Sequence, residues 1–394
     1  MDFFAEYWLV ISFYVGVSLL VYFNRDKFEF QGKVIALYKT KLGINAMKMI
    51  ARKFPRSVKT FGTLSIWAGF AGMVLIVSMI VYGVYQLIFE PSAPAMFTPV
   101  IPGFNIPGGI YLPLVEGLLA LFIVIVVHEF SHGMVSKVYN IPIKSSGFVM
   151  FGPIPGAFVE PEEEKLEKAS DKVKLSILGA GPFSNVVLFT LLFLVALGGA
   201  WFISDAYQAG GLTVNDFTEE PIPGLNSGDT IISFDGEEIG LLSDLQDSLD
   251  ETTPGQQVTL GLQDREVDIE LRTNPVNESR SWIGVTLAQV VVPANGNSFL
   301  EFIQAPLFWL FGTPYALSLT EALGLIQWIF ILSLGIGLVN LLPVGPVDGG
   351  RMFLIAMKRY IREDLAKSIW VWTSKVLFVT LILLVLVPII RALL

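Results

Sequence analysis

The sequence contains no cysteine and only two histidines among its 394 residues. The lack of cysteine excludes disulfides, cysteine nucleophiles and thiolate ligands, so a metal site here must use histidine, carboxylate or water. Charge is scarce as well, because charged residues make up 15% of the chain while hydrophobic residues make up 53%. This balance is far from that of a soluble domain and is typical of a membrane protein with several spans.

Long apolar runs predict where the chain crosses the membrane. Runs long enough to span occur at 4–23, 60–88, 112–137, 174–203, 318–343 and 368–391. The N-terminus carries acids and no basic n-region, so we interpret the first run as a retained span and not as a cleaved signal peptide. We therefore predict a polytopic α-helical membrane protein with about six transmembrane helices.

Charged residues occur in blocks that predict the orientation in the bilayer. Residues 24–59 carry ten Lys and Arg against two acids, whereas residues 60–136 carry no Lys or Arg. Because basic loops remain in the cytoplasm, we expect the 24–59 loop, residues 138–173 and residues 349–364 inside. The N-terminus and residues 204–317 are then outside. The expected location is the cell membrane, with the chain crossing the lipid bilayer several times.

The sequence divides into an N-terminal membrane region at 1–203, a module of different character at 204–291 and a C-terminal membrane region at 292–394. In the module, "TIISF" (230–234) and "VTLGL" (258–262) predict strands, and "LLSDLQDSLD" (241–250) predicts a short helix. We therefore expect a small β-rich extracytoplasmic domain with its own core.

A turn pattern in this module resembles that of a PDZ domain. In "GLNSGDTIISFDGEEI" (224–239), Gly228-Asp229 leads into a strand and Asp235-Gly236 forms the hairpin that follows. Another small β-roll with an Asp-Gly turn is the alternative. The segment "SWIGVTL" (281–287) is either the last strand or a loop that binds a peptide carboxylate.

Both histidines fall in a single apolar run, in the motif "HEFSH" at 128–132. Ionisable groups are costly at membrane depth and are functional there by default. Positions i and i+4 share one helix face, so His128 and His132 can hold one Zn²⁺, with Glu129 beside them as general base. The alternative, a chance pair of histidines at the end of a span, does not account for the glutamate between them.

A catalytic zinc site needs a third protein ligand, and with both histidines used it must be a carboxylate. Asp348 in "LVNLLPVGPVDGGRMF" (338–353) is the candidate, because Pro343 and Pro346 break the helix before it and free the backbone. Taken alone, Asp348 fits the N-cap of a following helix equally well. The topology favours the ligand, since His128 and Asp348 both fall toward the cytoplasmic ends of their spans.

These motifs resemble those of the site-2 protease family of intramembrane zinc metalloproteases. "HEFSH" in one membrane helix and "NLLPVGPVDGG" (340–350) in a later one are similar to that family's two zinc-site motifs, and "GAGPFSN" (179–185) is similar to its glycine-proline-asparagine motif. The inserted PDZ-like module and the lack of cysteine resemble prokaryotic or archaeal-type members more than animal ones. The resemblance implies that His128, His132 and Asp348 bind one zinc ion and that Glu129 activates water.

Two asparagines belong to the motifs, with their roles left open. An asparagine inside a span must hydrogen-bond a partner, since an unsatisfied amide in lipid is costly. For Asn185 we favour contact with the substrate or with the oxyanion of the reaction, and a tie between two helices is the alternative. For Asn340 we favour support of the Asp348 loop over those same roles.

Two apolar stretches, 141–160 and 296–315, are interrupted by Gly or Pro, and we predict interfacial or re-entrant segments with irregular backbone. In the first, the resemblance implies a membrane-associated β-hairpin. Its edge strand, with Gly156, Ala157 and Phe158, would pair with an unwound substrate helix. A plain cytoplasmic loop is the alternative.

The sequence thus predicts a zinc metalloendopeptidase that cuts single-pass membrane protein substrates within or near their transmembrane helices. A non-proteolytic zinc-binding scaffold is the alternative, and the intact Glu129 argues against it. A transporter would show repeated halves and several intramembrane acids, and neither is visible. The module at 204–291 binds a peptide terminus, gates access, or is a solvated face with no recognition role. Its three Arg against seventeen acids argue against a nucleic-acid partner.

Overall fold

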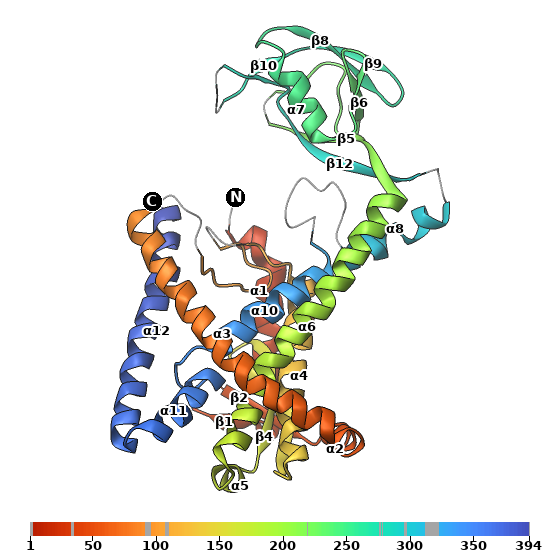
Figure 1. The fold of residues 1–394 in the computed structure, drawn as a ribbon. Helices are drawn as coiled ribbons and strands as arrows, with labels where there is room; N and C mark the ends of the chain where they lie inside the picture. The colour runs from red at the N-terminus through yellow and green to blue at the C-terminus, as the bar shows by residue number, and fades with distance from the viewer. Residues whose placement is uncertain are drawn as a thin grey trace. The chain divides into compact units, whose positions relative to one another are not determined.

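The computed structural model describes residues 3–32, 35–90, 96–106, 110–218, 220–275, 277, 279–294, 298–311 and 323–393. The chain forms two compact units, and Figure 1 traces its path through both. One unit comprises Met1–Phe193 with Trp328–Leu394, and the other comprises Leu194–Gln327. The second unit thus contains the β-rich module predicted at 204–291 together with helical residues on both sides of it.

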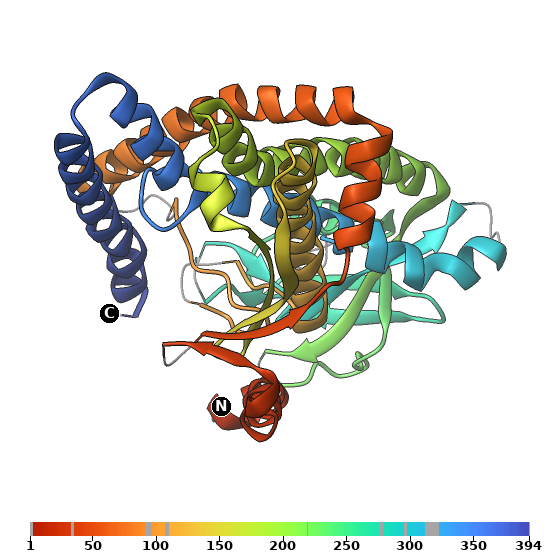
Figure 2. The ribbon, with the colours of Figure 1, turned by 90° about the horizontal axis from the view of Figure 1, so that it is seen from below.

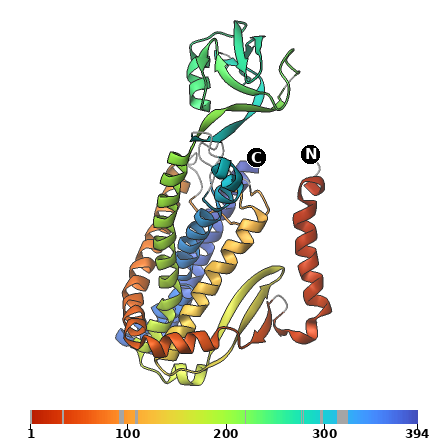
Figure 3. The same ribbon diagram turned by 90° about the vertical axis from the view of Figure 1, so that its right-hand side faces the viewer.

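The first unit is mainly helical, with one small sheet. Its elements are α1 (Phe3–Phe23), the 3-10 turn Arg25–Lys27, β1 (Glu29–Gln31), β2 (Ile35–Thr40), α2 (Ile44–Lys53), α3 (Pro55–Phe89), α4 (Leu114–Val138), β3 (Ile143–Phe151), β4 (Ile154–Pro161), α5 (Glu163–Glu167), the first part of α6 (Asp171–Ala206), most of α10 (Leu325–Asn340), α11 (Asp348–Tyr360) and α12 (Glu363–Leu393). Figure 3 shows α3, α4, α6 and α10 grouped together, and Figure 1 shows that α3 crosses α6 and does not run along it.

Four helices in the described part of the chain are long and apolar enough to cross a membrane, namely α3, α4, α6 and α12. Two shorter apolar helices, at Tyr7–Phe23 and Leu325–Asn340, coincide with the first and fifth predicted spans. Residues 318–322 of the fifth predicted span lie outside the described residues. The lengths and composition of these helices fit a multi-pass membrane protein.

Small residues allow these helices to pack closely, as is common in membranes. Ser65 Oγ of α3 donates to Ser176 O of α6 at 3.2 Å. A side chain at Gly179 would put a Cβ 2.5 Å from Ser65 O, so the contact requires glycine. On another face of α6, Ser333 Oγ of α10 donates to Asn185 O at 2.9 Å. Helix α6 is therefore fixed between α3 and α10.

The hairpin implied for residues 141–160 is present and belongs to a larger sheet. Strands β3 and β4 pair antiparallel, with Phe148 opposite Ala157 and Gly147 opposite Phe158. Strands β1 and β2, which lie in the segment predicted only as a basic loop, extend the sheet to the order β1-β2-β3-β4. Strand β4 is thus an edge strand, and it packs beside α4 (Figure 2).

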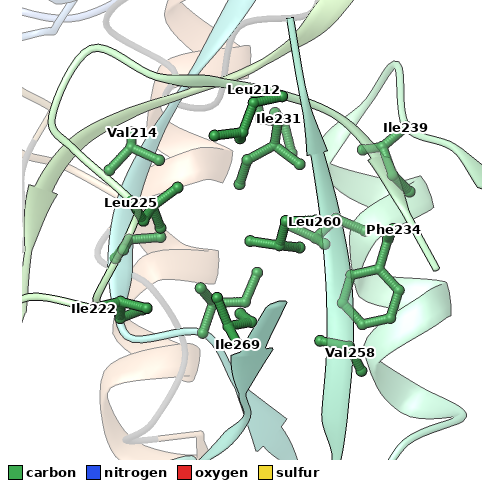
Figure 4. Packing of buried hydrophobic residues seen from close by; sticks show 14 of the residues in the cluster. Leu212, Val214, Ile222, Leu225, Ile231, Phe234, Ile239, Val258, Leu260 and Ile269 are labelled. Carbon is green, nitrogen blue, oxygen red and sulfur yellow. The ribbon is translucent and has the colours of Figure 1, made fainter. Parts of the chain in front are cut away.

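The second unit is a β-rich domain. Its elements besides the helix ends are β5 (Tyr207–Phe217), β6 (Thr230–Phe234), β7 (Glu237–Glu238), α7 (Leu242–Asp250), β8 (Gln257–Leu262), β9 (Glu266–Glu270), β10 (Arg272–Thr273), β11 (Ser281–Trp282), β12 (Val285–Pro293) and α8 (Ser298–Phe311). The main sheet has the order β12-β5-β6-β8-β9, with β7 paired to β6. Leucine, isoleucine, valine and phenylalanine side chains from these strands, from α7 and from the loops between them form its core. Figure 4 shows part of this cluster.

Local sequence signals predict three elements of this unit correctly. The segment "TIISF" is β6, "VTLGL" lies in β8, and the predicted short helix is α7. Asp235 and Gly236 both have positive φ, 48° and 85°, as the two-residue turn between β6 and β7 requires. Of the two alternatives for 281–287, the strand is present: Ser281–Trp282 is β11 and Val285 begins β12.

The prediction of irregular backbone for 296–315 is wrong for the part that the structure describes. Residues Ser298–Phe311 form the helix α8, with Pro306 inside it. A proline in a helix removes one backbone hydrogen bond and adds a local clash, a cost that an apolar helix packed on neighbours tolerates. Phe308 of this helix packs against Tyr207 at 5.0 Å between ring centroids. Residues 296, 297 and 312–315 lie outside the described residues.

Candidate metal centre and active site

Helix α4 carries both histidines on one face. One helical turn separates His128 from His132, and their Nε2 atoms lie 3.1 Å apart. The two side chains are nearly buried, with 6% and 9% of their residue surfaces exposed. The helical spacing that the motif predicted is therefore realised, and both rings point toward one place.

Asp348 completes the cluster from a distant part of the chain. Its Oδ2 lies 3.1 Å from His128 Nε2 and 3.2 Å from His132 Nε2. Helix α11 begins at Asp348 and its N-cap is Val347, so Asp348 is not the cap of this helix. Its carboxylate faces the histidines, as the metal-ligand interpretation requires.

Two glycines after Asp348 make this approach possible. The chain folds back on itself between Leu341 and Gly350. A Cβ on Gly349 would lie 2.6 Å from Leu342 O, and one on Gly350 would lie 2.7 Å from Gly345 N. Side chains therefore do not fit at either position. The "DGG" sequence reflects this close backbone approach as well as the ligand.

A backbone carbonyl sets the protonation of His132. Its Nδ1 lies 2.6 Å from Ile177 O of α6. A carbonyl oxygen only accepts, so Nδ1 carries the proton and donates it. The Nε2 atom is then unprotonated, and its lone pair faces His128 and Asp348. A metal-binding histidine needs this tautomer.

Asn185 contacts His128 on the ring edge opposite the cluster. The Asn185 amide is fully buried and its nitrogen lies 3.3 Å from His128 Nδ1. Its Oδ1 has no hydrogen-bond partner among the described residues. The opposite amide orientation gives the Nδ1–H of His128 an acceptor and leaves Nε2 unprotonated, as in His132. The structure thus places Asn185 behind His128, between α6 and α4.

Gly181 provides the space that an ion would need. A Cβ on this residue would lie 2.6 Å from His128 Nε2 and closer still to His132 Nε2. Zinc binds imidazole nitrogen at about 2.0–2.1 Å, so the space beside Gly181 lies near coordination distance from both rings. Ligand atoms of His128, His132 and Asp348 all lie within 4.8 Å of one another. Two imidazoles and one carboxylate suit Zn²⁺ and leave one position open.

Glu129 lies next to the cluster and contacts the edge strand. Its Oε2 accepts a hydrogen bond of 2.9 Å from Val159 N of β4. Glu129 also lines a cavity of about 150 Å³ together with Ala157 and Phe158, whereas Gly156 is buried in β4 and is not part of the lining. The general-base candidate and the predicted substrate strand are therefore adjacent.

One predicted site residue, Asn340, does not take the role expected of it, and three residues without a predicted role contribute to the site. Asn340 Nδ2 donates to Ile336 O in its own helix at 3.0 Å, so its described bond does not reach the Asp348 loop. Ile177 and Val159 contribute backbone atoms, so the identity of their side chains could not indicate these contacts. Gly181 was visible in the sequence only as part of the motif "GAGPFSN".

The chain is similar in sequence to known proteins. A model of peptidase family M50 matches residues 116–384. An uncharacterized protein of Methanocaldococcus jannaschii is 24% identical over 84% of this chain and 81% of its own length. A protein of Fusobacterium nucleatum, named as a candidate zinc metalloprotease, is 24% identical over 59% of this chain and 79% of its own length.

One solved structure is similar to a small part of the chain. It is the PDZ domain of an SdrC-like protein from Listeria monocytogenes, with 22% identity, a TM-score of 0.18, and coverage of 20% of this chain and 86% of that domain. A TM-score this low gives no support to a fold assignment. The PDZ-like fold of the second unit stays a prediction.

Proposed function

Because this chain belongs to peptidase family M50, the site-2 protease family that its motifs resemble, we propose that it is a zinc metalloendopeptidase that hydrolyses peptide bonds within or near transmembrane helices. Its substrates would be membrane-anchored proteins with a single span. The observation that carries the proposal is the convergence of His128, His132 and Asp348 at the apolar helix α4, with Glu129 beside them. A proteolytic site among apolar helices suits substrates that are themselves in the bilayer.

The chain's own residues would divide the work as follows. His128, His132 and Asp348 would hold Zn²⁺, which when bound supplies a Lewis acid that polarises the scissile carbonyl and acidifies water. Glu129 would accept a proton from the attacking water and return it to the leaving amine. The hydrogen bond from the Val159 N–H would orient the Glu129 carboxylate for this proton transfer.

Hydrogen bonds at the Nδ1 atoms would keep the two metal-binding imidazoles in place. The carbonyl of Ile177 fixes the tautomer of His132, and we propose that the Asn185 amide does the same for His128. This role differs from the substrate or oxyanion contact favoured from sequence. The support is positional, since Asn185 approaches the nitrogen that faces away from Asp348.

The edge strand β4 would hold the substrate. A transmembrane helix hides its peptide bonds in internal hydrogen bonds, so hydrolysis requires local unwinding into an extended segment. Such a segment can pair with an exposed strand edge. Strand β4 has no strand partner on its outer side among the described residues, and it lies beside Glu129. Ala157 and Phe158 would then line the substrate path.

The distribution of basic residues supports an orientation. We propose that the sheet and the metal centre lie toward the cytoplasmic side, with the N-terminus and the second unit outside. The basic segment 24–59 contains β1, β2 and α2, which belong to the same unit as the metal centre.

The decisive experiment is cleavage of a tagged single-span substrate by the purified protein in detergent. We expect Glu129→Gln to lower the rate by about 10²–10⁴-fold with bound zinc unchanged, because a general base contributes about that much. The matched control is Glu163→Gln, an exposed acid on α5, which should retain full activity. A zinc chelator should abolish cleavage by the wild type. Cleavage by Glu129→Gln at the wild-type rate would contradict the proposal.

A second candidate function, that of a non-proteolytic binding protein, is favoured by a groove in the second unit. The groove has a volume of about 760 Å³ and lies between α7 and the edge strand β12. Ser281 lines it, is 5% exposed, and its Oγ has no hydrogen-bond partner in the described part of the chain. We propose that an extended peptide terminus binds here by strand addition.

The two candidate functions make different predictions for the same variants. A scaffold that acts through this groove loses binding in Ser281→Val and is indifferent to Glu129→Gln. A protease loses cleavage in Glu129→Gln even when the peptide still binds. Titration of both variants with a fluorescently labelled peptide, beside the cleavage assay, distinguishes the two functions.

A further inference from the structure

A pocket that contains none of the metal-centre residues is lined by four basic side chains. It has a volume of about 340 Å³ and is lined by Lys48 and Arg52 of α2, Lys59 of α3 and Lys137 of α4. The remaining lining residues are uncharged. We call these four cations and the space between them the basic pocket. Its volume falls at the small end of the range for small-molecule sites, about 300–1,000 Å³.

Among the residues that the structure describes, the four cations lack acidic partners. Within the described residues, none of them forms an ion pair with a carboxylate. Other lysines of the same unit do, since Lys39 lies 2.8 Å from Glu29 and Lys358 lies 2.8 Å from Glu363. Like charges brought together without counter-charges repel each other, and an anion relieves this repulsion.

The pocket's walls are fixed by the packing of α2 against α4. Met47 of α2 lies so close to Gly133 of α4 that a side chain at 133 would collide with its sulfur. The cations of α2 are therefore held near Lys137 and are not merely spread along a mobile loop. We infer that the basic pocket binds the phosphate of an anionic phospholipid headgroup.

The surroundings favour a lipid over a free anion. Large apolar side chains on and beside α2 are exposed, with 60% of Met49, 50% of Phe54 and 69% of Leu42 accessible. A short helix with apolar side chains beside basic ones is typical of a segment that lies in the membrane interface. The pocket also lies where α3 begins and α4 ends, at one end of two candidate spans. A free phosphate would use the cations alone and would leave the apolar side chains without a role.

Binding of this lipid should stabilise the contact between α2 and α4. The headgroup would neutralise charge from α2, α3 and α4 at once, and so join the three elements. Basic residues near an anionic membrane surface contribute about fivefold in affinity each, or ~1 kcal/mol. This inference does not depend on protease activity, because its readout is binding and thermal stability.

The test uses the full-length protein in detergent, with a short-chain phosphatidylglycerol as the probe. We compare the wild type with Lys48→Gln/Arg52→Gln, which removes two cations of the pocket. The matched control is Lys53→Gln/Arg56→Gln, which removes the same charge from neighbouring exposed positions that do not line the pocket. Phosphatidylcholine of the same chain length and inorganic phosphate are the comparison ligands.

We expect phosphatidylglycerol to raise the Tm of the wild type and of the control variant in a saturable way. The pocket variant should bind it at least tenfold more weakly. Its Tm in the absence of lipid should be no lower than that of the wild type, because removing two cations also relieves the repulsion. Equal weakening in both variants would overturn the inference, because it would indicate general surface charge. Stabilisation by inorganic phosphate as strong as that by phosphatidylglycerol would overturn it too, since the ligand would then be a free anion. No Tm shift with any ligand would likewise contradict it.

Discussion

The two units of this protein place polar and apolar side chains in opposite ways. The β-rich part of the second unit, residues 207–293, buries leucine, isoleucine and valine and leaves most of its acids exposed, as a soluble domain does. The first unit exposes large apolar side chains, such as Trp67 at 74% and Phe378 at 58%, while Ser65, Asn185 and Ser333 are fully buried. Burial of apolar area thus stabilises the second unit. Close helix packing and buried polar contacts position the groups of the first.

This difference explains why the candidate metal centre lies in the first unit. In lipid a polar group must find a partner inside the protein, so the buried polar atoms of the first unit form a chain of contacts. Ile177 O meets His132, Asn185 meets His128, and Asp348 meets both rings. Such contacts fix geometry more than they add stability. Substitutions in the first unit should therefore affect the metal centre before they affect folding.

Among single substitutions in the two units, we expect the largest effect from Gly181→Ala, which should abolish zinc binding by the first unit. The added methyl group would occupy the space between the two Nε2 atoms, so zinc binding should be lost. The control is Gly198→Ala on the same helix, where a Cβ meets nothing within 4 Å. Zinc content of the purified proteins is the measurement. Full zinc occupancy in Gly181→Ala would show that the ion does not lie where these residues converge.

A large effect on stability is expected from Leu260→Ala in the second unit. Leu260 is fully buried among the strands of the core. Removing its side chain should cost about 2–5 kcal/mol through lost burial and the cavity left behind. Hydrogen exchange of residues 207–293 in the full-length protein should accelerate, while zinc content should stay constant. A loss of zinc in this variant would mean that the two units are coupled more tightly than their separate cores suggest.

Asn185→Ala should have an intermediate effect on the metal centre. Loss of a group that orients a metal-binding histidine typically weakens metal affinity by about 10–100-fold. The expected signature is weaker zinc binding, with activity restored when zinc is added in excess. A residue that contacts the oxyanion would behave differently, because excess zinc would not restore its activity. Competition with a chelator measures the affinity.

The smallest effect is expected at an exposed ion pair of the first unit. Hydrogen bonds from Lys358 and Lys367 lower the pKa of Glu363 from its ordinary value of 4.5 to about 2. A carboxylate with a lowered pKa stabilises the folded state above its ordinary pKa, and this contribution disappears as pH falls from 4.5 toward 2. Because Glu363 is exposed, the contribution is small and screened by salt. The Tm difference between the wild type and Glu363→Gln should shrink over that pH range, and a difference that grows there would contradict this assignment.

Sequence patterns were informative where the relevant contacts are local. The spacing of His128 and His132 follows from helix geometry alone, and the strands and turns of the second unit follow from composition and Asp-Gly dipeptides. Pattern failed at α8, because Pro306 was given too much weight as a helix breaker. It also missed β1, β2 and α2 in the segment predicted only as a basic loop. The distant ligand Asp348 followed from the need for a carboxylate and from the topology of the spans, and the family resemblance agreed with it.

The sequence by itself determined that this is an apolar, multi-span chain with two histidines and a glutamate on one helix face. Only the tertiary structure decided which atoms meet them: the Val159 N–H at Glu129, the Ile177 carbonyl at His132, and Asn185 behind His128. The joining of β1 and β2 to the hairpin was decided in the same way. Backbone donors and acceptors are common to all residue types, so long-range contacts made through them leave no mark in the sequence.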